Sequence, residues 1–344
     1  MTRVLLVIPS ILKTGIEADV AADRHPTMDY YALAEALRAR NAHVEMLDYS
    51  HVANSGFPLD LALAWTAYRR RCEFDVIFTN GENVSLPLAL LFKSLRLRPR
   101  HVTIGHRLSS AKKRLLLTTL KAYEQIDMIF VYATSQRDYA QAVLGVPSER
   151  LSLIHFHADA RFYRPMNEPA SNELLVSAAG LEWRDYDTLI RAASDMPEVT
   201  FRLAAASPWS KHPNKTGDRQ LPPNVNARRY PYDELRDLYA ASTIVATPLL
   251  ENDFQAGVTT ILEAMAMGKP VIATRTTGQT DVIVDGENGL YVPPSDPDAF
   301  ACAIRRLCDD RDLRRHLGDN ARSWIEANAT LDRWASTIAD AIMG

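Results

Sequence analysis

Short apolar runs alternate with helical patterns along this 344-residue chain, and the alternation occurs in two separate blocks. In the first block, Arg3–Ile8 leads through a loop to the amphipathic pattern of Asp29–Arg38, for which Asp29 is the expected N-cap. In the second, Leu174–Ala179 leads to the helical pattern of Asp187–Ala193. Such alternation predicts an α/β fold with two Rossmann-like, doubly wound domains, each a parallel sheet covered by helices. The other expected strands are 43–47, 75–79, 101–104, 128–131, 200–205, 244–247 and 270–273.

The length of the chain also suits two domains better than one core. A polar stretch with two prolines separates the blocks, and we place the linker near 163–172. A second irregular region, Ser207–Pro223, holds four prolines and is expected to form a mobile surface loop. The expected units are an N-terminal domain at 1–165, a C-terminal domain at 170–325, and a C-terminal helix at 326–344 that packs back on the N-terminal domain.

The composition excludes several classes of protein. No apolar run approaches the roughly 20 residues that span a bilayer. The first apolar run is only about six residues long, which favours a buried strand over a signal peptide, so we expect a cytoplasmic protein. The three cysteines, Cys72, Cys302 and Cys308, are too few for a disulfide framework, and no His/Cys cluster has metal-ligand spacing. We therefore expect neither a disulfide scaffold nor a metal site.

One segment, Glu251–Ala273, combines a strand end, a glycine and a helix. Gly257 lets the chain turn into a helix near Val258–Met267, which Gly268 terminates. Free backbone N–H groups and the positive end of the dipole make such a helix start a phosphate site. Glu263, in the second turn, can accept hydrogen bonds from sugar hydroxyls. Taken alone, the arrangement is also compatible with an ordinary strand-to-helix turn.

The wider string resembles the donor site of family 4 of the retaining glycosyltransferases. The family pattern is Glu, seven residues, Glu, and then Ala-Met-Ala-x-Gly-x-Pro-Val, and Glu263 stands at the second Glu. The resemblance is strongest over residues 240–296, extends over 174–206 and fades before residue 100. The matching positions are Ala264, Met265, Ala266, Gly268, Pro270, Val271, Gly278, Asp281 and Asp285–Pro294.

The resemblance implies the GT-B architecture, in which two Rossmann-like domains face each other across a cleft. The N-terminal domain would take the acceptor and the C-terminal domain a nucleotide-sugar donor, a UDP-sugar first and a GDP-sugar second. Glu263 would bind the ribose hydroxyls, and the amides around Gly257, Val258 and Thr259 would hold the diphosphate. The reaction would transfer a hexose to an acceptor hydroxyl with retention, by a front-face mechanism that needs neither metal nor cofactor.

The chain departs from the family pattern at two positions. Gln255 replaces the first Glu of the pair, which usually lies near the transferred sugar; an amide can still bond sugar hydroxyls but carries no charge. Family members also carry an Arg and a Lys that neutralise the leaving diphosphate. Here Arg184 stands at the Lys position and no basic residue occupies the Arg position. We expect Arg184 to clamp a phosphate, the alternative being a surface arginine paired with Asp185 or Asp187.

In the N-terminal half, His106 directly follows an expected strand, where family members often place a histidine that contacts donor sugar and acceptor. The alternative is a structural histidine. Gly15, after the first strand, would replace the family's glycine pair beside the diphosphate. Thr79–Asn83 also follows a strand and could face the acceptor. His106, Arg184 and Gln255 are thus the expected catalytic residues.

The N-terminal half is basic. Residues 1–165 hold 21 Lys and Arg against 16 Asp and Glu, whereas residues 166–344 hold 18 against 26. Arg107–Lys121 is basic and amphipathic, and Arg69–Arg71, Arg96, Arg98 and Arg100 lie in the same half. Related enzymes that act on lipids dock to membranes through such a helix, so a peripheral membrane contact is one expectation. The alternative is an ordinary surface helix, and no nucleic-acid motif accompanies the charges.

The sequence therefore predicts a nucleotide-sugar-dependent glycosyltransferase whose acceptor is a lipid, a polysaccharide or a small metabolite. One rival is a sugar-nucleotide epimerase or a phosphorylase of the same architecture. Another is a catalytically degenerate binding or scaffold protein, which Gln255 and the missing basic residue motivate.

Overall fold

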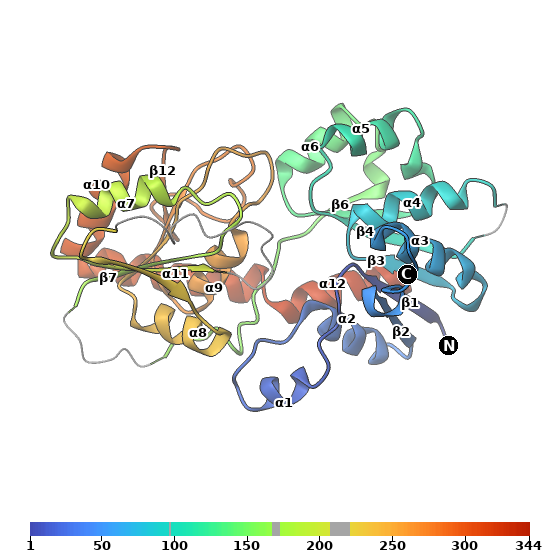
Figure 1. Ribbon diagram of the computed structural model, residues 1–344, viewed down its shortest axis with the longest axis horizontal. Coiled ribbons are helices and arrows are strands. Elements are labelled where there is room, and N and C mark those ends of the chain that lie inside the picture. The colour runs from blue at the N-terminus through green and yellow to red at the C-terminus, as the bar shows by residue number, and fades with distance from the viewer. Residues whose placement is uncertain (96–97, 167–172, 207–220) are drawn as a thin grey trace. The chain divides into compact units, whose positions relative to one another are not determined.

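The computed structural model describes residues 1–95, 98–166, 173–206 and 221–344, and its contacts divide the chain into two units (Figure 1). The first unit, the N-terminal domain, consists of residues 1–17, 27–155 and 332–344. The second, the C-terminal domain, consists of residues 18–26 and 156–331. Most of the expected linker and of the expected loop at 207–223 lies outside the described residues, as does Arg96. The two domains are described separately below.

Six parallel strands form the sheet of the N-terminal domain, in the order β2-β1-β3-β4-β5-β6. Their flavodoxin-like order reverses between β1 and β3, and ligands of such sheets bind at this switch point, beyond the carboxyl ends of the strands. The strands are β1 (Arg3–Ile8), β2 (His43–Asp48), β3 (Val76–Thr79), β4 (Arg100–Gly105), β5 (Met128–Val131) and β6 (Leu151–Leu153). The helices are α2 (Asp29–Arg38), α3 (Leu59–Arg69), α4 (Glu82–Phe92), α5 (Ala111–Thr118), α6 (Thr134–Ala142) and α12 (Leu331–Met343).

The central strands are apolar because helices cover both faces of the sheet. Along β1, every residue after Arg3 is buried. Leu5 and Val7 pack with Leu63 of α3 and Leu88 of α4 on one face. The expected strands of the first block are thereby confirmed. The short β6 was not expected, since three half-buried residues carry no periodic signal.

The expected N-cap role of Asp29 is wrong. The N-cap of α2 is Met28, in an extended conformation, and Asp29 is the first helical residue. One carboxylate oxygen of Asp29 accepts the N–H of Tyr30 at 2.8 Å, and the other accepts the side chain of Asn80 at 3.2 Å. The carboxylate remains in the first turn, where its charge favours the helix dipole.

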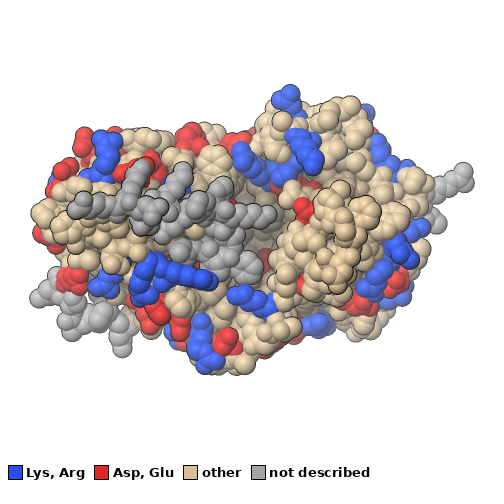
Figure 2. Space-filling model, in the orientation of Figure 1, with Lys and Arg blue, Asp and Glu red and all other residues tan. Residues whose placement is uncertain are grey.

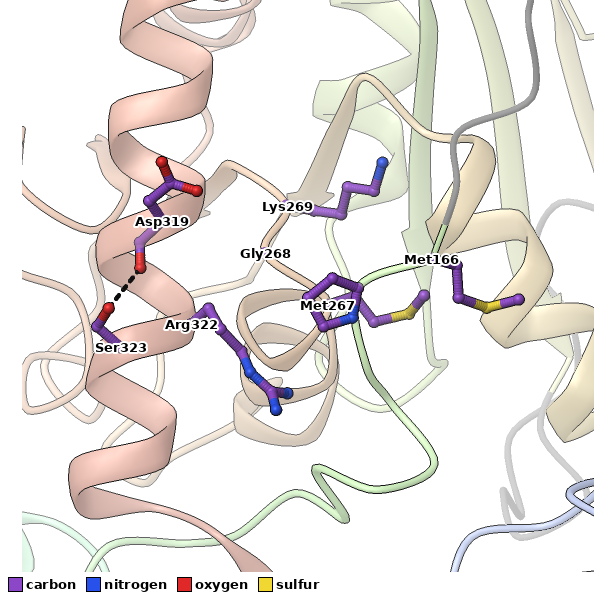
Figure 3. Close-up of a pocket in the computed structure, with 8 residues that line it drawn as sticks. Met166, Met267, Gly268, Lys269, Asp319, Arg322 and Ser323 are labelled. Atoms are coloured by element: carbon purple, nitrogen blue, oxygen red, sulfur yellow. Dashed lines mark hydrogen bonds between the residues drawn. The ribbon is translucent and has the colours of Figure 1, made fainter.

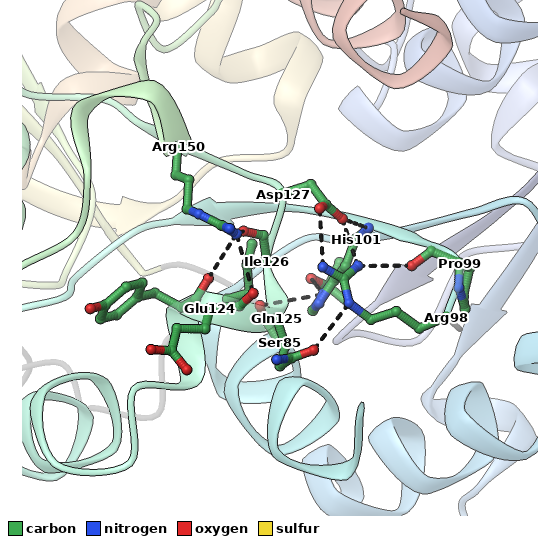
Figure 4. Close-up of polar contacts among 11 residues, drawn as sticks. Ser85, Arg98, Pro99, His101, Glu124, Gln125, Ile126, Asp127 and Arg150 are labelled. Carbon is green, nitrogen blue, oxygen red and sulfur yellow. Dashed lines mark hydrogen bonds and ion pairs between the residues drawn. The ribbon is translucent and has the colours of Figure 1, made fainter. Parts of the chain in front are cut away.

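Arg98 stabilises the fold of the N-terminal domain and does not belong to an unpaired basic surface. Its guanidinium forms two hydrogen bonds with Asp127, of 2.6 and 3.0 Å, and Asp127 also accepts the N–H of His101 (Figure 4). Burial lowers the pKa of His101 to about 4, so this histidine is neutral in the core. Arg150 donates to the carbonyl of Ile126, which lies just before β5 (Figure 4).

The C-terminal domain has its own six-stranded parallel sheet, in the order β12-β11-β10-β7-β8-β9. The strand order of a Rossmann fold is thus present, with its switch point between β7 and β10. The strands are β7 (Leu175–Ala179), β8 (Thr200–Ala206), β9 (Val225–Arg229), β10 (Ile244–Thr247), β11 (Val271–Thr274) and β12 (Leu290–Val292). The helices are α7 (Tyr186–Ser194), α8 (Tyr232–Ala241), α9 (Val258–Ala266), α10 (Pro297–Asp309) and α11 (Arg311–Asn328). The short α1 (Ile16–Ala21) begins in the N-terminal domain and runs into residues 18–26.

The tail consists of two helices, α11 and α12. The helical conformation is interrupted between them, where Thr330 forms an isolated β-bridge with Ala158. Residues 332–344 pack in the N-terminal domain: Trp334 Nε1 donates to the hydroxyl of Tyr132 at 3.2 Å, and Arg40 pairs with Asp340 at 2.8 Å. The chain thus returns to its first domain at the end.

Candidate functional site

Two loops meet at the switch point of the C-terminal sheet. The loop after β7 and the loop after β10 pair through a bridge between Arg184 and Leu249. Two backbone hydrogen bonds support it, from Leu250 N–H to Trp183 O at 3.0 Å and from Asp185 N–H to Pro248 O at 3.1 Å. This pairing brings the Arg184 side chain to the beginning of α9.

Gly257 is required by the turn into α9. It is the N-cap, with φ of +79°, a left-handed conformation that side chains disfavour. A Cβ at this position would lie 2.8 Å from Thr247 Cγ2 and 2.9 Å from Leu249 Cδ2. Val258 is buried, whereas Thr259 is exposed at the first turn. The expected helix start therefore exists; the N–H of Val258 donates back to Gln255 O at 3.4 Å, and Ile261 N–H donates to Gly257 O at 3.2 Å.

Arg184 lies against this helix start. Its Nε donates to Ala179 O at 2.7 Å, Nη1 to Glu182 O at 2.9 Å and Nη2 to Thr260 Oγ1 at 3.1 Å. Asp185 instead caps α7 by accepting from Thr188. No ion pair of Arg184 occurs within the described ranges, so the expected alternative, pairing with Asp185 or Asp187, is not observed. Three of five guanidinium N–H groups are used, which leaves one on each terminal nitrogen. Burial lowers the pKa of Arg184 from its ordinary value.

Glu263 lies in the second turn of α9, beneath two tyrosines that the sequence did not identify. The hydroxyl of Tyr239, from α8, donates to Glu263 Oε2 at 3.3 Å, and Tyr163 packs beside it with ring centroids 6.3 Å apart. Burial raises the pKa of Glu263 to about 7, although the Tyr163 and Tyr239 hydroxyls and the charge of Arg184 act in the opposite direction. The carboxylate is thus about half ionised at neutral pH.

Gln255 is 8% exposed, and neither its Oε1 nor its Nε2 has a hydrogen-bond partner among the described residues. Gln279, after β11, is fully buried and donates through Nε2 to Ala256 O at 3.2 Å, while its Oε1 is unpartnered in the same part of the structure. Buried polar atoms without protein partners are costly and rare, so the amide of Gln255 is available to bind a ligand or a water molecule. Glu251 does not replace the missing carboxylate, because its Oε1 accepts the N–H of Thr277 at 2.9 Å.

In the N-terminal domain, His106 follows β4 and is exposed. Its Nε2 lies 3.3 Å from Asn80 Oδ1. The expectation that Thr79–Asn83 faces an acceptor is wrong for two of its members. Thr79 is fully buried and donates to Thr103, and buried Glu82 accepts the N–H groups of His106 and Arg107. Gly15 has φ of +80° and no atom within 4 Å of a Cβ placed on it, so its turn requires glycine while its surroundings are open.

A cavity of about 440 Å³ lies at the other end of α9 (Figure 3). Met166, Met267, Lys269 and Arg322 contribute to its lining. Arg322 donates to Ala266 O at 2.6 Å, so its charge stabilises the C-terminal end of the helix dipole. Gly257 begins α9 and Met267 follows its last residue, so this cavity is separate from the switch point.

The basic helix of the N-terminal domain is only partly buried. On α5, Leu117 is fully buried while Leu115 is 58% exposed. Its Lys113 pairs with Glu82. On the face in Figure 2, the N-terminal domain carries a broad tan area with basic side chains around it. Within the described ranges, no group of three or more His, Cys, Asp or Glu residues could hold a metal, and no helix is long and apolar enough to cross a membrane.

Comparisons with known proteins agree with this architecture. Residues 173–310 match the model of a family described as glycosyl transferases group 1. The chain is 25% identical to D-inositol 3-phosphate glycosyltransferase of Corynebacterium glutamicum, covering 98% of this chain and 88% of the relative. It is 38% identical to the enzyme of that name from Corynebacterium kroppenstedtii over 107 residues, 31% of this chain and 22% of the relative.

Two solved structures share the whole fold. Sucrose-phosphate synthase from Thermosynechococcus elongatus superposes with a TM-score of 0.73 at 19% identity, covering 99% of this chain and 98% of that one. Anabaena HepE in complex with UDP and glucose gives 0.73 at 18% identity, covering 100% of both chains. Together with the two six-stranded parallel sheets, these likenesses confirm the expected pair of Rossmann-like domains.

Proposed function

We propose that this chain, a glycosyltransferase whose residues 173–310 belong to the glycosyl transferases group 1 family, moves a sugar from a nucleotide-diphosphate sugar to an acceptor hydroxyl with retention of configuration. The observation that carries the proposal is the Arg184 guanidinium at the start of α9, which lacks a carboxylate partner within the described ranges. A diphosphate placed there would meet the two remaining guanidinium N–H groups and the amides around Gly257, Val258 and Thr259.

In the proposed reaction, an acceptor hydroxyl attacks the anomeric carbon from the face that the diphosphate leaves. The bond between this carbon and the phosphate oxygen breaks, its electron pair stays on that oxygen, and the diphosphate takes the acceptor's proton. Negative charge therefore grows on the diphosphate in the transition state, where Arg184 and the dipole of α9 stabilise it. Because these groups supply the positive charge, we propose a reaction independent of metal.

For the donor, we propose a UDP-sugar. Solved structures of Anabaena HepE contain UDP, UDP-glucose, or UDP and glucose. Glu263 would accept hydrogen bonds from the ribose hydroxyls, and the unpartnered amide of Gln255 would bind hydroxyls of the transferred sugar. Gly15, with its open surroundings, would admit the diphosphate from the N-terminal domain. A GDP-sugar is the second choice.

For the acceptor, we propose a small phosphorylated polyol. The relative from Corynebacterium glutamicum is named for D-inositol 3-phosphate, and the N-terminal half of this chain is basic. His106 would then contact donor sugar and acceptor from the end of β4.

Thermal-shift measurements with UDP, GDP and ADP test the donor site, and stabilisation by UDP above the other two is expected. Mass spectrometry of UDP-sugars with inositol phosphates, with and without EDTA, tests transfer and metal independence. If no nucleoside diphosphate stabilises the protein, the proposal is wrong. If UDP binds but neither transfer nor donor hydrolysis occurs, the chain is the degenerate binding protein that Gln255 suggests. Release of a free epimerised sugar would indicate the epimerase.

A peripheral membrane contact is also proposed, and the structure favours α3 as its centre. Leu61 and Trp65 lie one turn apart on this helix and are 49% and 51% exposed, and Phe57 in the preceding loop is 72% exposed. Arg69 continues the same spacing and is exposed. Apolar and aromatic side chains followed by cations suit the interface of an anionic membrane, where this enzyme would remain peripheral and cytoplasmic.

A further inference from the structure

Three polar side chains form a hydrogen-bonded line at the switch point of the N-terminal sheet. Asn80 follows β3, His106 follows β4, and Asp29 begins α2. Asn80 Nδ2 lies 3.2 Å from Asp29 Oδ2, and Asn80 Oδ1 lies 3.3 Å from His106 Nε2. The three residues are separated by 51 and 26 positions along the chain, so only the fold brings them together.

The hydrogen bonds among these three side chains determine which nitrogen of the His106 ring carries the proton. An ionised carboxylate only accepts hydrogen bonds, so Asp29 must face the amide nitrogen of Asn80. The carbonyl oxygen of Asn80 then faces His106, and a carbonyl oxygen only accepts. His106 Nε2 must therefore carry a proton. A neutral imidazole holds one proton, so Nδ1 is left as a bare acceptor.

The backbone and ring of His106 are held in place. Its N–H donates to Glu82 Oε2 at 2.9 Å, and its carbonyl accepts from Gln136 Nε2 at 2.5 Å. The ring packs on Tyr132 with centroids 5.6 Å apart. His106 Nδ1 makes no hydrogen bond within the described ranges, and the side chain is exposed. The ring is fixed in place, its Nε2 is hydrogen-bonded and its Nδ1 is not, and this arrangement suits a residue that binds a ligand through Nδ1.

We propose that Asp29 and Asn80 are positioning residues that hold His106 as its Nε2–H tautomer, so that Nδ1 accepts a hydrogen bond from a substrate hydroxyl. The inference rests on the proposed function, which places a sugar or its acceptor beside His106. The other tautomer would present an N–H at Nδ1, which would repel the hydrogen of a hydroxyl that donates there. Through Asn80, Asp29 thus determines that His106 Nδ1 accepts a hydrogen bond from a substrate hydroxyl and does not donate one.

A single exchange of oxygen for nitrogen tests the line. In Asp29→Asn, the N–H of Tyr30 keeps the remaining oxygen, because it already donates to Asp29 Oδ1 at 2.8 Å. The new amide nitrogen then faces Asn80, whose amide must rotate to present its own oxygen. Its nitrogen now faces His106 Nε2, which must become the acceptor. The substitution should invert the tautomer of His106 without changing the shape of the site.

The readout is a two-dimensional NMR spectrum of ¹⁵N-labelled histidine side chains above the pKa of His106, with the His106 signals assigned from the spectrum of His106→Gln. The wild type should show the Nε2–H pattern and Asp29→Asn the Nδ1–H pattern. Asn80→Ala, a second variant, should give a mixture of both. Asp138→Asn, an exposed position on α6, is the matched control and should keep the wild-type pattern. With a UDP-sugar and acceptor, Asp29→Asn should lower kcat at least about tenfold while leaving UDP affinity unchanged.

Two outcomes would overturn the inference: an Nδ1–H tautomer in the wild type, or a tautomer that Asp29→Asn and Asn80→Ala both leave unchanged. An unchanged kcat in a tautomer-inverted variant would likewise overturn the role toward the hydroxyl. A wild type with the Nε2–H tautomer that binds no nucleoside diphosphate would instead refute the proposed function and leave the tautomer assignment standing.

Discussion

The guanidinium of Arg184 occupies the space that a side chain would need at Gly180. A Cβ on Gly180 would lie 2.4 Å from Arg184 Nη2, and one on Gly257 would lie 3.3 Å from Nη1. Both glycines have positive φ, of +95° and +79°. The charge at the beginning of α9 is therefore seated between two backbone segments where no other residue type fits without strain.

Gly180→Ala should displace Arg184 and lower donor turnover. The left-handed backbone alone costs about 1–3 kcal/mol in stability, and the contact with Nη2 adds to it. We expect kcat to fall at least about tenfold because the guanidinium loses its alignment with the leaving diphosphate. Gly145→Ala is the matched control, since Gly145 has φ of +69° with no atom within 4 Å of a Cβ. Equal loss of turnover in both variants would contradict this explanation.

Arg184→Lys should distinguish the effect of the positive charge on turnover from the effect of the planar shape of the guanidinium. Lysine keeps the positive charge but lacks the planar fork that can serve Ala179, Thr260 and a phosphate together. We expect kcat to fall by about 10²-fold, with a smaller change in KM, because the charge on the leaving group is greatest in the transition state. Steady-state kinetics would measure the split, and Arg191→Lys, at an exposed position on α7, should leave both constants unchanged. A change confined to KM would argue for ground-state binding only.

Glu263→Gln should change the pH dependence of stability. The folded pKa of Glu263, about 7, lies above its ordinary value of 4.5, so the folded state holds the extra proton. This proton favours folding below pH 4.5, and the advantage is lost as the pH rises through 7, with a total of about 3 kcal/mol. The glutamine has no proton to lose. Urea unfolding should therefore show the variant gaining stability relative to the wild type from pH 5 to pH 8, and parallel profiles would contradict the burial argument.

The same ionisation predicts how nucleotide binding depends on pH. Ribose hydroxyls donate more strongly to a carboxylate than to a neutral acid, so UDP affinity of the wild type should rise between pH 6 and pH 8. About a tenth of Glu263 is ionised one unit below its pKa, which sets an upper limit of about tenfold on the change. Isothermal titration calorimetry should find the affinity of Glu263→Gln lower and flat over this range. A wild-type affinity that does not change with pH would place the ribose elsewhere.

Local patterns predicted the fold well because parallel strands buried on both faces are apolar. The bounds of β1, β5 and β10 were predicted to the residue. β9 was missed because its residues, Val-Asn-Ala-Arg-Arg, are mostly polar and only Val225 is buried. The phosphate-binding turn at Gly257 was also predictable, because strand, glycine and helix are consecutive in sequence.

The remaining parts of the site depend on contacts distant in sequence. Tyr239 reaches Glu263 from a different helix, 24 residues away, and no spacing rule relates the two. Asp29 resembled a helix cap in the sequence, yet its Oδ2 accepts a hydrogen bond from Asn80 Nδ2, 51 residues away. His101 lies in β4 and His106 directly follows this strand, and only the packing makes the first a neutral core residue and the second an exposed group.

Trp65→Ser should weaken membrane contact if α3 is its centre. Co-sedimentation with vesicles that contain phosphatidylglycerol measures the bound fraction, and we expect at least a several-fold loss of binding because half of the indole is exposed to contact the interface. Leu115→Ser on α5 tests the helix that the sequence favoured, at a similar exposed fraction of 58%. A larger loss of vesicle binding in Leu115→Ser than in Trp65→Ser would indicate that α5 makes the membrane contact. If the wild type does not bind the vesicles, the membrane proposal is wrong.

Gln255→Ala should weaken sugar binding without weakening nucleotide binding. The amide is buried and both of its polar atoms lack partners in the described part of the chain, so its removal relieves a cost of about 1–3 kcal/mol that partly offsets the cavity left behind. We therefore expect little change in Tm and an unchanged affinity for UDP. The affinity for the UDP-sugar should fall about tenfold toward that for UDP, since only the sugar would contact the amide. Gln279→Ala removes a similarly buried amide that already bonds Ala256, and it should cost stability instead. Equal losses of UDP and UDP-sugar affinity in Gln255→Ala would mean that Gln255 supports the turn before α9 and does not contact the sugar.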